Sequence, residues 1–296
     1  MTETAPAPIV NAATRREIAS GVIVIPDHRI PLVPNIGIVL GDHSALVVDT
    51  GMGPQNGAAV LRAAQEIAGD RRLVLTLTHF HPEHGFGAAP FKGKAQIIYN
   101  RAQGEDLAAK GEGYLEMFRG MGPEIAGALE GTELVEADDL YDGSHHEIDL
   151  GGRRVVLRNW GMAHTRGDQI VWLPDAGVLF TGDLAEEKTF PIFPWFPPDD
   201  TDIDAANWVA ALDDCIALEP KIVVPGHGEV GGVGIIEDVR DYIADVAAKV
   251  ASAKAAGKDA ETIIAELEEQ IRADHPDWHF PEWIGFALRY HIDTRS

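Results

Sequence analysis

Side chains that could bind metal ions are concentrated between residues 79 and 84. Three histidines and one glutamate fall within these six residues: His79, His81, Glu83 and His84. The apolar run at residues 73–77 is typical of a buried strand, so the cluster is expected at a strand's carboxyl end, where α/β folds place their sites. Because residues two apart in an extended segment point the same way, His79 and His81 can bind one metal ion. Pro82 suits the first turn of a short helix, which would direct Glu83 and His84 toward a second ion.

Three further residues of metal-binding type follow predicted strands later in the chain. They are His164, Asp183 and His227, and each has a glycine nearby. Glycine permits the tight turns that bring a loop back toward a shared cleft. A single histidine or aspartate at a strand end is usually an ordinary hydrogen-bonded residue. Seven such residues behind the same kind of strand instead predict a common metal site.

The composition limits the partners and the location of the protein. Of the 296 residues, 45% are hydrophobic and 24% are charged, which is enough apolar material for a real core. The formal net charge of -23 argues against nucleic acid and against an anionic membrane face, because both need a positive protein surface. No apolar run reaches the ~18 residues of a membrane span. The single cysteine, Cys215, fits a reducing compartment, so a cytoplasmic location is expected. With nucleic acid and membrane disfavoured, the expected partner is a small-molecule substrate.

Strand and helix patterns alternate along most of the chain, which indicates an α/β fold. The expected elements are a hairpin at 36–49, helices at 54–68, 101–130 and 203–218, strands between 147 and 183 and at 222–224, and a mostly helical segment beyond 233. Residues 1–20 have no apolar stretch of signal-peptide length and are expected to be a loose leader. Residues 21–296 are expected to form a single domain that includes a C-terminal helical segment at about 234–296.

Taken together, these motifs resemble the metallo-β-lactamase superfamily. The family pattern His-x-His-x-Asp-His, followed by a His, an Asp and a last His, corresponds to His79, His81, Glu83, His84, His164, Asp183 and His227. The resemblance implies an αββα four-layer sandwich with two metal ions, expected to be Zn²⁺, in a cleft at one edge. It implies that the first ion binds His79, His81 and His164. The second then binds Glu83, His84 and His227, Asp183 bridges the two ions, and Asp49 steadies the ligand loop.

Three positions distinguish this chain among members of the family, and one of them departs from the family pattern. Glu83 stands where the pattern has aspartate, and its longer side chain predicts a softer second site that binds its metal more weakly. Asp183 stands where β-lactamases of the family usually have cysteine or serine, whereas lactonases and thioesterases have aspartate. Glu186 occupies a position that is often a carboxylate-binding lysine in the cysteine-containing members. Hydrolysis of β-lactams is therefore expected only as a weak side activity.

The expected function is hydrolysis of an ester, thioester, lactone or amide bond in a small, largely apolar substrate. Two zinc ions can lower the pKa of a shared water to near ~7, and Glu83 is the expected catalytic carboxylate beside it. The aromatic loop after Asp183 is expected to contact the substrate through Phe190, Phe193 and Trp195.

Two other functions remain open on the same sequence. One is a mononuclear non-haem iron oxidoreductase of the dioxygenase type, which applies if Glu83 does not hold a second metal. The other is a non-catalytic ligand carrier that keeps a metal pocket. Iron or manganese would also suit the ligands. Metal content separates the oxidoreductase from the hydrolase, and turnover of any ester separates both enzymes from the carrier.

Overall fold

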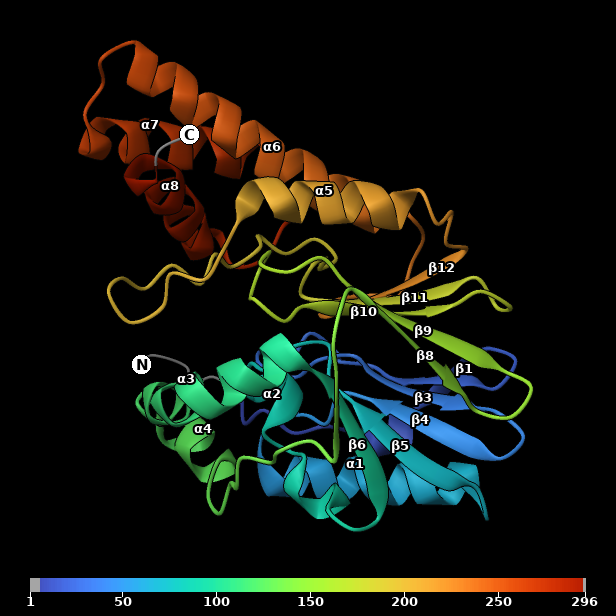
Figure 1. Cartoon of the computed structure of the whole chain (residues 1–296). Helices are drawn as coiled ribbons and strands as arrows, with labels where there is room; N and C mark the ends of the chain where they lie inside the picture. The colour runs from blue at the N-terminus through green and yellow to red at the C-terminus, as the bar shows by residue number, and fades with distance from the viewer. Residues whose placement is uncertain (1–5, 295–296) are drawn as a thin grey trace.

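Two mixed β-sheets pack face to face, with helices on both outer sides, in a computed structural model that describes residues 6–294 (Figure 1). The first sheet has the order β1 (Arg16–Ala19), β2 (Val22–Ile25), β3 (Ile36–Leu40), β4 (Ser44–Val48), β5 (Arg72–Thr76), β6 (Ala95–Asn100) and β7 (Asp139–Tyr141). The second has the order β12 (Ile222–Pro225), β11 (Val178–Gly182), β10 (Gln169–Leu173), β9 (Arg154–Asn159) and β8 (His145–Asp149). This arrangement confirms the predicted αββα sandwich.

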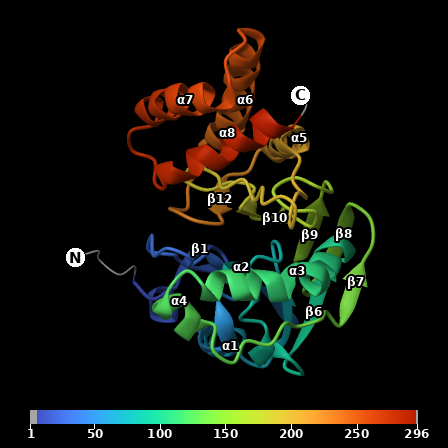
Figure 2. The ribbon, with the colours of Figure 1, turned by 90° about the vertical axis from the view of Figure 1, so that its left-hand side faces the viewer.

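The helices fall into two sets that follow the two halves of the sequence (Figures 1 and 2). The first sheet is accompanied by α1 (Gly53–Ala68), α2 (Pro82–Gly85), α3 (Arg101–Arg119) and α4 (Pro123–Ala128). The second sheet is covered by α5 (Ala205–Ile216) and α6 (Gly234–Ala255), against which α7 (Ala260–Asp274) and α8 (Ile284–Asp293) pack. Short 3-10 helices are η1 (Ala12–Thr14), η2 (Ala89–Phe91) and η3 (Pro281–Trp283). No helix within residues 6–294 is both long enough and apolar enough to cross a membrane.

The apolar core has three layers because the central strands are buried on both faces. In β2, Val22 and Val24 join the cluster between the two sheets, whereas Ile23 and Ile25 join the cluster on the α1 side. Alternate residues of a strand point to opposite faces, so a strand buried on both sides must be apolar throughout. A third cluster lies between the second sheet and helices α5 to α8.

Residues 6–20 are not a loose leader, so that prediction is wrong for this part of the chain. Arg16 pairs with Val24 and Glu17 with Ile23 in an antiparallel ladder. Val10 is only 5% exposed, and its N–H donates a hydrogen bond of 2.9 Å to Oδ1 of Asn56. An edge strand with exposed polar side chains gives little hydrophobic signal, which is why the sequence did not indicate it. Residues 1–5 of the expected leader lie outside the described residues.

One parallel strand pair in each sheet brings distant loops together. In the first sheet β4 pairs with β5 so that Val48 lies opposite Thr76, and the loops that follow both strands leave from the same end. In the second sheet β11 pairs with β12 so that Gly182 lies opposite Pro225. Residues that follow these four strands are therefore neighbours in space, although they are far apart in the sequence.

Candidate metal centre

All seven metal-type side chains predicted from the sequence converge where these strands end. They form two groups, and within each group the candidate ligand atoms lie within 4.8 Å of one another. The first group is His79, His81 and His164, and the second group is Glu83, His84, Asp183 and His227. The loop after β5 and the short helix α2 supply four of these residues, and loops of the second sheet supply three. Because both sheets contribute, the site exists only when the two halves of the sandwich are packed together.

Asp183 lies between the two groups. Its Oδ1 atom is 3.1 Å from Nε2 of His84 and 3.8 Å from Nε2 of His227, both in the second group. Its Oδ2 atom is 3.7 Å from Nε2 of His79 in the first group. Each oxygen therefore faces a different group, which is the arrangement that a bridging carboxylate requires.

The atoms that face one another in these groups lack hydrogen-bond partners among the described residues. They include Nε2 of His79 and Oε2 of Glu83, both of which are buried. Buried polar atoms nearly always have a partner, and leaving one without any costs free energy. Imidazole nitrogens and carboxylate oxygens together are a ligand set for Zn²⁺ and related divalent metals. The residues therefore fit two divalent ions, one in each group.

The first group is prepared to bind a cation because its imidazoles are neutral. Burial lowers the pKa of His79 and His81 well below the ordinary value, with neighbouring imidazoles acting in the same direction. Burial likewise lowers the pKa of His164 to about 4. A neutral imidazole keeps a free lone pair, so these three side chains can donate to a metal at neutral pH.

The second group carries charge. Burial alone would lower the pKa of His84, but the carboxylates of Asp183 and Asp49 raise it well above the ordinary value. Burial alone would raise the pKa of Asp183, but the imidazoles of His84 and His227 hold it well below its usual range. The carboxylates of Asp183 and Asp49 therefore favour positive charge at this place, and a divalent ion would supply it.

Asp49 holds the ligand loop from the end of β4, which is the position that the family resemblance implied. Its Oδ1 accepts a hydrogen bond of 2.7 Å from the backbone N–H of Thr78, and its Oδ2 accepts one of 2.9 Å from the Thr78 hydroxyl. The same Oδ2 lies 2.9 Å from Nδ1 of His84. Asp49 has a φ of 67°, a left-handed conformation that a non-glycine residue adopts only when its surroundings enforce it.

Other residues that position the ligands were not found from the sequence. Asp168 accepts hydrogen bonds from the backbone N–H of Thr165 at 2.6 Å and from its hydroxyl at 2.8 Å, which fixes the turn that carries His164. The ring nitrogen Nδ1 of His227 lies 2.9 Å from the carbonyl oxygen of Val33. An aspartate a few residues after a histidine is only a weak sequence signal for a residue that positions a ligand. A backbone carbonyl gives no sequence signal at all.

Tyr114 of α3 also contacts a ligand. Its ring stacks on the imidazole of His81 with centroids 5.0 Å apart and planes inclined by 26°. Its hydroxyl donates a hydrogen bond of 2.8 Å to Oδ2 of Asp200, and Oδ1 of the same carboxylate accepts one of 2.9 Å from Lys110. The first ligand group is therefore supported from the helical layer as well as from the sheets.

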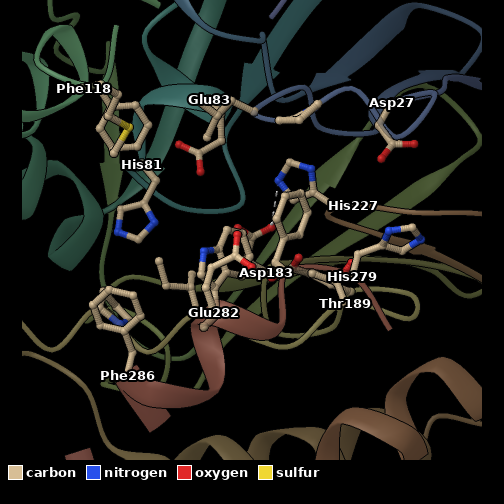
Figure 3. A pocket seen from close by; sticks show the side chains of 18 of the residues that line it. Asp27, His81, Glu83, Phe118, Asp183, Thr189, His227, His279, Glu282 and Phe286 are labelled. Carbon is tan, nitrogen blue, oxygen red and sulfur yellow. Dashed lines mark ion pairs between the residues drawn. The ribbon is translucent and has the colours of Figure 1, made fainter. Parts of the chain in front are cut away.

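A cavity of about 390 Å³ opens onto the two ligand groups (Figure 3). Four of the seven candidate ligands line it, namely His81, Glu83, Asp183 and His227. The rest of its wall comes from residues 27–32, from α3 and residue 121, from the loop at 186–196, and from residues 279–286 at the start of α8. Most of these are apolar: Ile30, Pro31, Leu32, Met117, Phe118, Met121, Ile192, Pro194, Phe196, Phe280, Trp283 and Phe286.

The aromatic loop lines the cavity, but it does so through residues other than the three predicted to contact the substrate. Phe190 and Phe193 are fully buried in the core beneath α5 to α8, and neither they nor Trp195 line the cavity. Ile192, Pro194 and Phe196 of the same loop line it instead. The large rings gain more by burial among Trp208, Tyr242 and Tyr290, and this turns the intervening residues toward the cavity.

Comparison with known sequences gives a consistent result. The sequence profile of the "Metallo-beta-lactamase superfamily" matches residues 29–227. The chain is 26% identical over 233 residues to a linear primary-alkylsulfatase of Pseudomonas sp. (strain ATCC 19151), covering 67% of this chain and 43% of that protein. It is 25% identical over 218 residues to a metallo-beta-lactamase type 2 of Bacteroides fragilis, covering 72% of this chain and 76% of that protein. This chain thus spans less than half the length of the alkylsulfatase.

Solved structures share the fold over most of the chain. The stereoselective inverting sec-alkylsulfatase Pisa1 from Pseudomonas sp. aligns with a TM-score of 0.71 and 16% identity, covering 94% of this chain and 49% of that one. The DIM-1 metallo-beta-lactamase aligns with a TM-score of 0.58 and 15% identity, covering 77% of this chain and 94% of that one. The sandwich, the two ligand groups at its strand ends and the match over residues 29–227 lead to one conclusion. This chain belongs to the metallo-β-lactamase superfamily.

Proposed function

We propose that the protein is a metal-dependent hydrolase of an ester, thioester, lactone or amide bond in a small, largely apolar substrate. The observation that carries the proposal is that four side chains, His81, Glu83, Asp183 and His227, belong both to the ligand groups and to the cavity wall. A substrate in the cavity would lie directly against the metal positions. Two of the relatives, a sulfatase and a β-lactamase, support hydrolysis as the general reaction.

Zinc is the proposed metal, and iron or manganese would suit the same ligands. When bound, two divalent ions would polarise the scissile group and lower the pKa of water toward ~7. In this proposal His79, His81 and His164 hold the first ion. Glu83, His84 and His227 hold the second ion, and Asp183 is shared between them. Asp49 keeps the loop of the first four ligands in place through Thr78 and His84.

Glu83 is the proposed catalytic carboxylate. Its side chain starts from α2 and lines the cavity, and its Oε2 atom has no hydrogen-bond partner among the described residues. Burial raises its pKa, while His84 opposes the shift and Asp183 adds to it. A carboxyl group with a raised pKa beside the reacting bond can accept a proton from attacking water and return it to the leaving group.

The cavity wall supports a substrate with a substantial apolar part. Met117, Phe118 and Met121 of the α3 side face the cavity, as does Phe286 of α8. Apolar walls with a few polar anchors are usual for small-molecule sites. The match to the family ends at residue 227, so the wall at 279–286 comes from a segment beyond it. We propose that this segment belongs to the same single domain.

A cytoplasmic location is proposed with the hydrolase. The support is limited to Cys215, the single cysteine of the sequence, which is buried and unpaired. A protein without disulfides fits a reducing compartment.

A mononuclear iron oxidoreductase is the second candidate. It is favoured by the first ligand group, because His79, His81 and His164 could hold a single ion without the second group. We rank it lower because the four ligands of the second group are equally close together.

The decisive experiment measures metal content and turnover on the same samples. The protein would be purified without added metal, analysed for metals, and assayed with matched esters, thioesters, lactones and β-lactams. We expect close to two zinc ions per chain and turnover of a carbonyl substrate. His79→Ala should remove both the bound zinc and the turnover. His145→Ala, at an exposed position of β8, should remove neither. One iron per chain with oxygen consumption would instead favour the oxidoreductase, and two metals without any turnover would favour the carrier.

A further inference from the structure

The two ends of the cavity, which lie on opposite sides of the metal positions, differ in chemistry. Figure 3 shows Phe118 and Phe286 on the same side as His81, and Asp27 and His279 on the same side as His227. We call the second side the acidic arm and define it by Asp27, Glu186, Thr189, His279 and Phe280, all of which line the cavity. The proposed hydrolase reaction uses none of these residues.

Three chain segments build the acidic arm. Residues 188–189 pair with residue 279: the backbone N–H of His279 donates a bond of 2.8 Å to the carbonyl of Lys188, and Thr189 and His279 form an isolated bridge. The guanidinium of Arg29 donates a bond of 3.1 Å to the carbonyl of Glu187, which joins the loop at 27–32 to the same segment. The arm is therefore a built structure with fixed walls.

Glu186 is the most unusual residue of this arm. It is 3% exposed and lines the cavity, and among residues 6–294 no hydrogen bond or ion pair holds its carboxyl group, so its oxygen atoms reach the cavity. Buried carboxyl groups without a partner are rare, because leaving one unpaired costs free energy. A ligand that brings a positive charge to this place would give the Glu186 carboxylate a partner.

Away from the metal centre, the charged side chains of the cavity wall favour a positive ligand. Apart from Glu83 and Asp183, which belong to the metal centre, the described lining residues include three carboxylates: Asp27, Glu186 and Glu282. Arg29 is the only arginine or lysine among these lining residues, and its guanidinium is paired with Glu187. A substrate with a sulfate, phosphate or free carboxylate in this arm would meet repulsion from these groups.

Aromatic rings add a second attraction for a cation. Phe280 follows His279 directly, and its ring stacks on that of Trp283 with centroids 4.5 Å apart and planes inclined by 13°. Both residues line the cavity. An alkylammonium group is attracted by aromatic faces and by carboxylates at once. Phe280 also has a φ of 58°, a strained conformation of the kind that is often found at binding sites.

We propose that the acidic arm binds a positively charged alkylammonium group of the substrate, and that Glu186 determines this preference. The inference rests on the proposed hydrolase function and names its substrate class: an apolar acyl group on the His81 side, joined to an alcohol or amine part that carries a cation. The charge preference would then be opposite to that expected for anionic substrates such as alkyl sulfates.

The test uses three esters of one acyl group, so that the apolar side is the same in all of them. The alcohols are choline, its neutral isostere 3,3-dimethylbutanol, and anionic 3-sulfopropanol. We expect kcat/KM for the choline ester to exceed that for the neutral ester by about tenfold, and the anionic ester to be the poorest. Glu186→Gln should bring the choline-to-neutral ratio close to one, and Glu186→Lys should reverse the order. A merely structural role for Glu186 would lower all three rates together and leave the ratio unchanged.

A second measurement tests the arm without turnover. Calorimetric titration of the zinc-loaded protein with choline should detect binding that Glu186→Gln weakens about tenfold. Glu237→Gln removes the same charge from the exposed first turn of α6 and should leave both binding and ester ratios as in the wild type. Circular dichroism and zinc content must match between variants. Absence of choline binding, or equal binding by wild type and Glu186→Gln, overturns the proposal. If choline binds through Glu186 and no ester is hydrolysed, the hydrolase proposal fails and the cation site stands.

Discussion

Oδ2 of Asp49 lies 2.9 Å from Nδ1 of His84, and the same carboxylate accepts two hydrogen bonds from Thr78. One buried side chain at the end of β4 thus orients a candidate ligand of the second group and fixes the loop that carries the first. Groups that orient metal ligands in this way usually affect metal affinity almost as strongly as the ligands themselves.

Asp49→Asn should weaken zinc binding about 10- to 100-fold, because an amide nitrogen cannot accept the hydrogen bond from His84. The unfolding free energy should fall by about 1–3 kcal/mol as buried donors lose their acceptor. Competition with a zinc chelator and thermal unfolding measure the two effects. Asp149→Asn is the matched control, since Asp149 is exposed on β8 and accepts a bond only from the Gly151 backbone. Equal zinc affinity in the two variants would contradict the role given to Asp49.

Glu83→Gln should lower metal content to about one ion per chain, because a neutral amide offsets less of the metal's charge. Glu83→Asp keeps the charge on a shorter side chain, so it should lose less metal than Glu83→Gln. Elemental analysis of all three proteins at one zinc concentration gives the stoichiometry. Glu124→Gln, on the exposed surface of α4, serves as control. Two ions in Glu83→Gln together with full turnover would show that Glu83 is neither ligand nor base.

Gly226→Ala should disrupt the metal centre without introducing any polar group. A Cβ atom at position 226 would lie 2.0 Å from Oδ1 of Asp183 and 2.8 Å from the carbonyl carbon of Gly182. Neither contact is tolerable, so the carboxylate between the two ligand groups must move. We expect loss of zinc from both groups, measured by elemental analysis. Gly232→Ala, where a Cβ atom would meet nothing within 4 Å, should retain the wild-type content; a loss there as well would point to a general effect of the substitution.

His291 should make the metal-free protein sensitive to acid. It is 8% exposed in α8, and burial, with Lys254 acting in the same direction, lowers its pKa to about 4. The unfolded chain takes up this proton near pH ~6.5, before the folded chain does, so its contribution to stability is present above ~6.5 and lost as pH falls toward 4. His291→Leu should therefore lose about 3 kcal/mol less than the wild type over this range.

Chemical denaturation in chelator at several pH values measures this difference. His145→Leu, on the exposed strand β8, should follow the wild-type curve. Parallel curves for the wild type and His291→Leu would refute the assignment of acid sensitivity to His291.

The sequence indicated the residues that gather into the two groups because their chemistry is distinctive. Imidazoles and carboxylates that follow apolar strands stand out, and parallel pairing of β4 with β5 and of β11 with β12 then places them together. The residues that line the cavity could not be recognised in this way. Met117 and Phe286 resemble ordinary core residues in the sequence, and only the packing of α3 and α8 turns them toward the cavity.

The expected substrate contacts differ from the residues that line the cavity for a similar physical reason. Phe190 and Phe193 were expected at the substrate because they are aromatic and follow Asp183, but a large ring is equally suited to a core, and helices α5 to α8 provide one. The location of those helices depends on contacts between segments far apart in the chain. Hydrophobic periodicity reports which face of a segment is buried, and it does not report what covers that face.

The first strand has a protective role that follows from its place in the sheet. β1 covers the backbone hydrogen-bonding edge of β2, whose four residues Val22–Ile25 are all buried and apolar. A chain shortened to begin after residue 20 would leave that edge bare. Exposed apolar edges act as templates for pairing with other molecules. The sheet ends instead on β1, where Arg16 and Glu17 are exposed, and charged side chains on an edge strand disfavour pairing with other molecules.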